Sequence, residues 1–105
     1  MTQTSPEAER LFAALLDAIK AERYDDFVGL GSHCFQHAIS RETFDAVVAH
    51  VSAFLKQGYE ARYLGMLKRK EHQIHLWKIS YADGGDEHLA HLTFHEGKAT
   101  GFWLT

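Results

Sequence analysis

The feature that most constrains the fold is a series of alternating segments, separated by turns, in the C-terminal part of this chain of 105 residues. A charged break without apolar residues lies at 68–71, two glycines stand in the break at 83–86, and a Glu-Gly turn lies at 96–97. Glycine suits such turns because it readily adopts positive φ angles. The segments between the turns are rich in aromatic, β-branched and other large apolar residues, as strands prefer. They predict an antiparallel meander with strands at 59–67, 73–82, 87–95 and 98–104.

Closing the hairpins at these turns predicts which side chains share a face, because neighbouring residues of a strand point to opposite faces. Ala82 is paired with Glu87 and His95 with Lys98, so that Trp77 lies opposite Leu92. One face is then expected to carry His75, Trp77, Ile79, Tyr81, Ala90, Leu92, Phe94 and Trp103. The other is expected to carry Ile74, Leu76, Lys78, Leu89, His91, Thr93, Phe102 and Leu104. Neither face is plainly polar, unlike a sheet with one solvated face.

Helical periodicity predicts three helices before the sheet. The first begins at a Ser5 cap followed by Pro6, and its apolar stripe consists of Ala8, Leu11, Phe12, Leu15, Leu16 and Ile19. A short second helix is expected at 22–30. The third begins at a Ser40 cap and ends at Gly58, with the stripe Phe44, Val47, Val48, Val51, Phe54 and Leu55. Alternating side chains at 32–39 favour a short strand between the second and third helices.

This order of elements predicts a single α+β domain over residues 1–105, with N-terminal helices packed on the Trp77 face of the sheet. The helices cannot also cover the reverse face. That face would carry an apolar patch of Ile74, Leu76, Leu89, Phe102 and Leu104, to which Tyr63 and Leu67 add, with His91 and Lys78 at its rim. Exposed patches of this kind are rare on monomers, so we predict a homodimer joined sheet to sheet.

Three parts of the chain carry a resemblance to a known superfamily: the Tyr24–Phe27 segment after the first helix, the helix end at Gly58, and the final strand from Gly97 to Trp103. With these features the chain resembles the nuclear transport factor 2-like superfamily, a cystatin-like α+β roll, and within it an uncharacterised bacterial branch. The resemblance implies a curved sheet wrapped on a long helix, a cone-shaped pocket on the helix-covered face, and homodimers through the other face. Members include isomerases, dehydratases, cyclases and non-catalytic binding domains.

Inward-facing aromatic residues with polar tips favour a pocket for a small apolar ligand. The candidate pocket residues are Tyr24, His75, Trp77, Tyr81 and Trp103. A filled core without a cavity is the structural alternative. No inward-facing aspartate matches the base of the isomerase branch, so we assign no catalytic residue. The sequence favours a non-catalytic ligand-binding or protein-interaction module. The alternative is an isomerase, dehydratase or cyclase-like enzyme that uses His75 or Tyr24 as its acid or base.

Eight histidines raise the question of a metal site. His33 and His37 fall on one side of their segment whether it is a strand or a helix, but no third ligand is near in sequence and no His-Glu-x-x-His motif is present. Cys34 is the single cysteine and is expected to be an inert, partly buried thiol. We therefore predict no metal site and no cofactor.

The charge and hydropathy of the chain exclude further classes of partner. A net charge of −3 gives no electrostatic basis for binding nucleic acid. No apolar run approaches the length of a membrane span, and the N-terminus lacks the features of a secretory signal. The expectation is a cytoplasmic protein without membrane contact.

Overall fold

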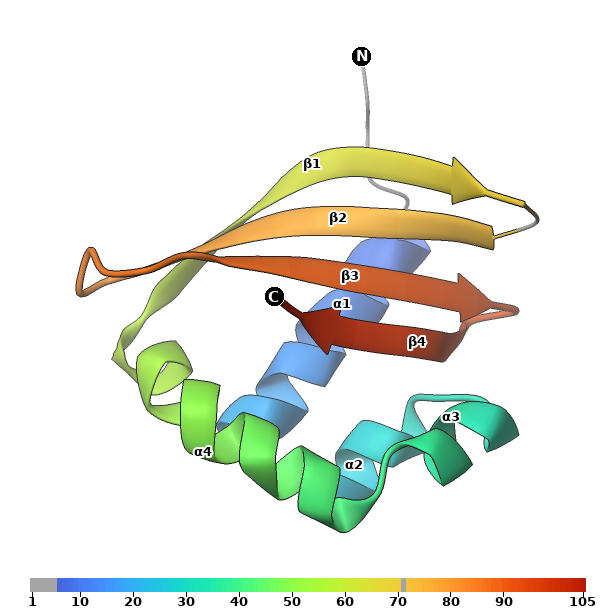
Figure 1. Cartoon of the computed structure of the whole chain (residues 1–105), viewed down its shortest axis with the longest axis horizontal. Coiled ribbons are helices and arrows are strands. Elements are labelled where there is room, and N and C mark those ends of the chain that lie inside the picture. The colour runs from blue at the N-terminus through green and yellow to red at the C-terminus, as the bar shows by residue number, and fades with distance from the viewer. Residues whose placement is uncertain (1–5, 71) are drawn as a thin grey trace.

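The computed structural model describes residues 6–70 and 72–105. In chain order the elements are α1 (Pro6–Lys20), α2 (Tyr24–Gly29), α3 (His33–Ala38), α4 (Arg41–Gln57), β1 (Tyr59–Arg69), β2 (His72–Tyr81), β3 (His88–His95) and β4 (Lys98–Leu104). The strands form a curved antiparallel sheet in the order β1-β2-β3-β4, and the helices lie on one of its faces (Figure 1). The predicted α+β fold, with helices on a single face of the sheet, is confirmed. No helix in the described ranges is long and apolar enough to cross a membrane.

The first helix buries its predicted stripe. Each of the six stripe residues, together with Ala18, is buried, whereas Glu9 and Asp17 on the opposite side are exposed. Glu7 and Glu9 lie in the first turn and Lys20 in the last, which complements the helix dipole. The predicted Ser5 cap lies outside the described residues. The helix therefore forms where its apolar spacing predicts, and it crosses the sheet as the main core element.

The segment predicted as a strand at 32–39 forms the helix α3 instead, so that prediction was wrong. The Ser32 side chain accepts a hydrogen bond from the backbone N–H of Phe35 at 3.2 Å, which caps the helix. Phe35 is buried, and Ile39 at the helix end packs half-buried against the same core. Two apolar side chains four residues apart share a helix face. The cap and this spacing outweigh the short alternation of side chains.

The β2–β3 hairpin closes in a longer loop than predicted. Trp77 pairs with Ala90 and His75 pairs with Leu92, which is a shift of two residues from the predicted register. The loop is supported by a hydrogen bond from the Gly85 N–H to Asp83 Oδ1 at 2.8 Å. Since side chains alternate with a period of two, an even shift leaves every face assignment in these two strands unchanged.

A β-bulge in β4 reverses the predicted faces of that strand. Phe94 pairs with Ala99 but Thr93 pairs with Gly101, so Thr100 is an extra residue. Phe102 and Leu104 therefore lie on the helix-covered face, opposite Leu92 and Ala90, and not on the reverse face. Trp103 lies on the reverse face, opposite His91, and is 42% exposed. The predicted faces of Phe102, Leu104 and Trp103 were wrong, because the one extra residue reverses the alternation of side chains in the rest of the strand.

The same irregularity occurs in β1. Tyr63 pairs with Trp77 and Gly65 pairs with Leu76, which makes Leu64 the extra residue. Tyr63 consequently points to the helix-covered face and not to the reverse face as predicted. Leu67, opposite Ile74, keeps its predicted place on the reverse face.

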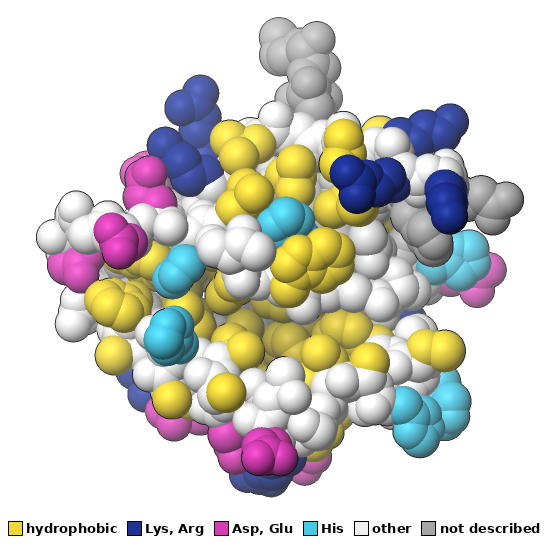
Figure 2. Space-filling view, viewed as in Figure 1, with side chains coloured by type: hydrophobic (Ala, Val, Ile, Leu, Met, Phe, Trp, Pro, Cys, Tyr) yellow, Lys and Arg dark blue, Asp and Glu magenta, His cyan; other side chains and the backbone are white. Residues whose placement is uncertain are grey.

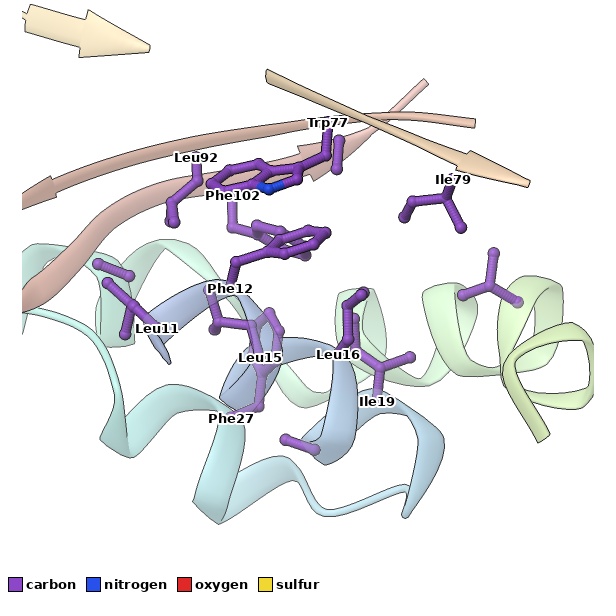
Figure 3. Packing of buried hydrophobic residues seen from close by; sticks show 14 of the residues in the cluster. Leu11, Phe12, Leu15, Leu16, Ile19, Phe27, Trp77, Ile79, Leu92 and Phe102 are labelled. Atoms are coloured by element: carbon purple, nitrogen blue, oxygen red, sulfur yellow. The ribbon is translucent and has the colours of Figure 1, made fainter. Parts of the chain in front are cut away.

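Aromatic packing fills the space between the helices and the sheet. The rings of Phe12 and Trp77 are stacked, with centroids 4.1 Å apart and planes 5° apart (Figure 3). The ring centroid of Phe102 lies 6.3 Å from that of Phe12 and 6.0 Å from that of Phe27. Trp77 is 2% exposed. The centre of the predicted pocket face is thus occupied by the protein's own side chains.

Candidate functional site

The predicted pocket residues lie in different surroundings. The Tyr24 hydroxyl donates a hydrogen bond to the Ile39 carbonyl at 2.7 Å, which ties α2 to the end of α3. Tyr81 is buried and its hydroxyl lies 2.6 Å from Nδ1 of His88. Trp77 is stacked in the core and Trp103 stands on the opposite face of the sheet. These five side chains, His75 included, do not surround a common space, and their part in ligand binding stays a prediction.

His75 is held in a pair that the sequence did not reveal. Its Nδ1 lies 3.1 Å from the hydroxyl oxygen of Tyr63, in a hydrogen bond whose donor depends on the imidazole tautomer. The imidazole stacks on Phe94 with centroids 5.3 Å apart. Burial lowers the pKa of His75 and raises the pKa of Tyr63, so both groups favour their neutral forms. The pair joins β1 to β2 inside the fold through a neutral polar contact.

An open groove of about 510 Å³ runs between α1 and β1. Its apolar lining includes Phe12, Leu16 and the edge of Trp77, and Glu9 and Arg10 also line it. Of the predicted pocket residues, Trp77 is the one that lines this groove. It is the place on the helix-covered side where a small apolar molecule would meet aromatic side chains.

The reverse face of the sheet has no covering element among the described residues, and we call it the outer face. Its apolar residues are Leu67, Ile74, Leu76, Leu89 and Trp103, with His91 among them. Leu67 and Trp103 are 44% and 42% exposed. Figure 2 shows hydrophobic side chains around a histidine over the strands, with basic side chains at the border. The predicted positions of Ile74, Leu76, Leu89 and His91 on this face are confirmed.

Trp103 forms one side of a shallow groove on the outer face. The groove has a volume of about 400 Å³, and its apolar lining includes Ile74 and the Trp103 ring. A Cβ atom on Gly101 would lie 2.8 Å from Thr93 Oγ1 and 3.2 Å from the Trp103 ring. The indole can therefore lie against the strand because residue 101 has no side chain.

The histidines give one close pair, His33 and His37 on α3, whose Nε2 atoms lie 3.0 Å apart. Within the described residues, no group of three or more His, Cys, Asp or Glu side chains could hold a metal ion together. Cys34 is exposed, not partly buried as predicted, because Phe35 is the α3 residue that turns toward the core.

Comparison with known proteins adds no family to this picture. No protein-family model matches the chain, and no curated protein has significant similarity to it. The resemblance to the nuclear transport factor 2-like superfamily therefore stays a prediction.

Proposed function

We propose that this domain is a non-catalytic protein-interaction module that forms a homodimer through the outer face of its sheet. The observation that carries the proposal is the row of exposed apolar side chains on a face that no described element covers. Leu67 and Trp103 are each more than two-fifths exposed there. Burial of a large apolar side chain contributes about 1.5–3 kcal/mol, whereas association costs about 4–15 kcal/mol. Several such side chains from each copy are enough to offset that cost.

The size of the face fits a second copy of the chain. Strands spaced about 4.8 Å apart and roughly 30 Å long give the four-stranded sheet a face of about 600 Å². A standard interface takes about 800 Å² from each partner. The outer face and its rim therefore match one side of an ordinary dimer interface.

The charges on this face also permit self-association. On this face Lys78 stands opposite Arg62 in the ladder between β1 and β2, and the Lys78 Nζ lies 3.8 Å from a carboxylate oxygen of Glu87. Burial lowers the pKa of His91, which favours a neutral ring at the centre of the face. Two copies related by a two-fold axis would bring the same apolar surface together.

The test is the molar mass of the full chain in solution over a range of concentrations. Light scattering is expected to give twice the monomer mass of 11.9 kDa at tens of micromolar. A monomer mass throughout that range would contradict the proposal.

A second candidate function, binding of a small apolar ligand, rests on the groove between α1 and β1. Phe12, Leu16 and Trp77 line this groove. In a Trp103→Phe variant, Trp77 is the single remaining tryptophan and its fluorescence reports on the groove. An apolar probe such as anilinonaphthalene sulfonate is expected to change that fluorescence. A further Ala13→Trp substitution, which fills the groove, is expected to abolish dye binding as followed by dye emission; unchanged binding would exclude this groove.

A further inference from the structure

Two histidines on α3 aim ring nitrogens at each other. Nε2 of His33 and Nε2 of His37 lie 3.0 Å apart, with ring centroids 4.3 Å apart and planes at 74°. Residues four apart lie on one side of a helix, which is why the rings meet. Both side chains are exposed, and Figure 2 shows histidine side chains gathered over α3 at the lower right. The pair is open to ions from the solvent.

The short helix that carries the pair is anchored at several points. Ser32 caps it, and the Ser32 N–H donates to the Ala99 carbonyl of β4 at 2.8 Å. Phe35 is 1% exposed and fixes the helix to the core. The Gln36 side chain donates to the Gly31 carbonyl at 3.3 Å. These contacts hold the backbone of α3, so a ligand that joins the two imidazoles has little further backbone entropy to overcome.

The pair has the chemistry of a chelating metal site. In the neutral form one Nε2 carries a hydrogen and donates it, while the other accepts with its lone pair. A metal ion between the rings takes both Nε2 lone pairs, and the ring that held its hydrogen on Nε2 holds it on Nδ1 instead. The geometry points to a surface site at His33 and His37 for a divalent transition-metal ion of the copper and nickel class.

The chemistry of the donor atoms favours this class of metal. Imidazole nitrogens suit copper, nickel and zinc, and the affinity of a given site for these ions generally rises from nickel(II) to copper(II) and falls again at zinc(II). In the hydrogen-bonded pair one lone pair points at the hydrogen of the other Nε2, so the exposed rings turn when both lone pairs bind one ion.

The site is open and has only two protein ligands in one copy of the chain. No third His, Cys, Asp or Glu side chain joins the pair among the residues described. Solvent therefore completes the coordination, which is typical of exchangeable binding and not of a closed structural site. The inference does not depend on dimer formation, because α3 lies beside the edge strand β4 and contributes no residue to the outer face (Figure 1).

The test is isothermal titration of the tag-free full chain with copper(II), nickel(II) and zinc(II) chlorides, each alone. One equivalent of copper(II) is expected to bind more tightly than nickel(II) or zinc(II). His33→Ala and His37→Ala are each expected to weaken copper binding by about tenfold or more. Both residues are exposed, so the variants should fold like the parent chain, as circular dichroism would verify.

Matched controls separate this pair from other histidines. His50→Ala removes an exposed histidine on α4 and should leave copper affinity unchanged. A double variant His37→Ala with Ala38→His keeps the number of histidines but moves one ring off the shared side, and it should bind like His37→Ala. Paramagnetic resonance of the copper complex should show two nitrogen ligands in the parent chain and one in each single variant. Equal affinity in the parent, His33→Ala and His37→Ala would overturn the assignment.

Discussion

The indole of Trp103 stacks on the imidazole of His91 on the outer face of the sheet, with ring centroids 4.8 Å apart and planes 17° apart. The two residues meet because the bulge at Thr100 turns Trp103 outward, opposite His91. Burial lowers the pKa of His91, which favours the neutral ring in this stack. A large aromatic surface is thereby held flat against the sheet, at the centre of the face proposed to meet a second copy.

Because of the bulge, alanine substitutions of two neighbouring aromatic residues should reduce the free energy of unfolding by very different amounts. Phe102 is 8% exposed and packs on Phe12 and Phe27, so Phe102→Ala should reduce the free energy of unfolding by about 3–5 kcal/mol. Trp103→Ala should reduce it by about 1 kcal/mol or less. Urea denaturation measures both at a concentration low enough to keep the chain monomeric. The reverse order would mean that β4 lacks the bulge.

Deletion of the bulge residue also tests the register of β4. Without Thr100, Ala99 still pairs with Phe94 and Gly101 with Thr93, so the ladder becomes regular and Phe102 keeps its buried face. Cooperative unfolding is therefore expected to persist in this deletion variant, as urea denaturation would measure. If β4 had no bulge, the deletion would exchange the two faces beyond residue 99, so loss of cooperative unfolding would contradict the observed register.

His75 predicts a pH dependence of stability. Burial lowers its pKa below the usual 6.5, so the unfolded chain binds a proton more readily than the folded one. The His75 contribution to the free energy of unfolding is therefore fully present above pH 6.5. It decreases as the pH falls from there toward the lowered pKa.

Urea denaturation between pH 7.5 and pH 5, values spanning about the usual histidine range, measures this contribution. His75→Phe keeps an aromatic ring against Phe94 but cannot titrate, so it should show a shallower loss of stability over this interval than the parent. His50→Gln, at an exposed position, should keep the parental slope. An unchanged slope in His75→Phe would show that another group carries the dependence.

The cap of α3 links stability to the inferred metal site. Ser32→Ala removes the side-chain acceptor for the Phe35 N–H and should cost about 1 kcal/mol. Because the helix ends then fray, copper affinity should fall as well, although neither imidazole is altered. Ser32→Asp retains a capping acceptor and should restore both properties. Parental copper affinity in Ser32→Ala would indicate that the histidine pair does not depend on the helix.

The sequence specifies the layers of this fold more fully than the details of its surface. Turn residues and the α1 stripe depend on local chemistry, and they predicted the meander, the first helix and the uncovered face. Bulges depend on one extra residue, and the alternation of side chains does not show where it is inserted. A signal was present, because an isolated glycine inside a strand often marks a bulge, and Gly65 and Gly101 follow the two extra residues.

Of the candidate site, only the part that lies in β2 and β3 was predicted correctly. Ile74, Leu76, Leu89 and His91 lie in β2 and β3, where the register shift was even, and their face is as expected. In β4, Phe102, Leu104 and Trp103 each lie on the face opposite to the predicted one. The Tyr63–His75 contact was missed for the same reason, since Leu64 moves Tyr63 inward. In α3, the serine cap at Ser32 was the signal for a helix.

The measurement that tests the central claim most directly is sedimentation equilibrium of two adjacent variants, Leu67→Glu and Met66→Glu. The two residues are 44% and 45% exposed, but they point to opposite faces of β1, with Leu67 paired to Ile74 on the outer face and Met66 paired to His75. A glutamate at position 67 would place a charge in the proposed interface. We predict a dimer for the parent chain and for Met66→Glu, and a monomer for Leu67→Glu. A dimer of Leu67→Glu as tight as that of Met66→Glu would contradict association through the outer face.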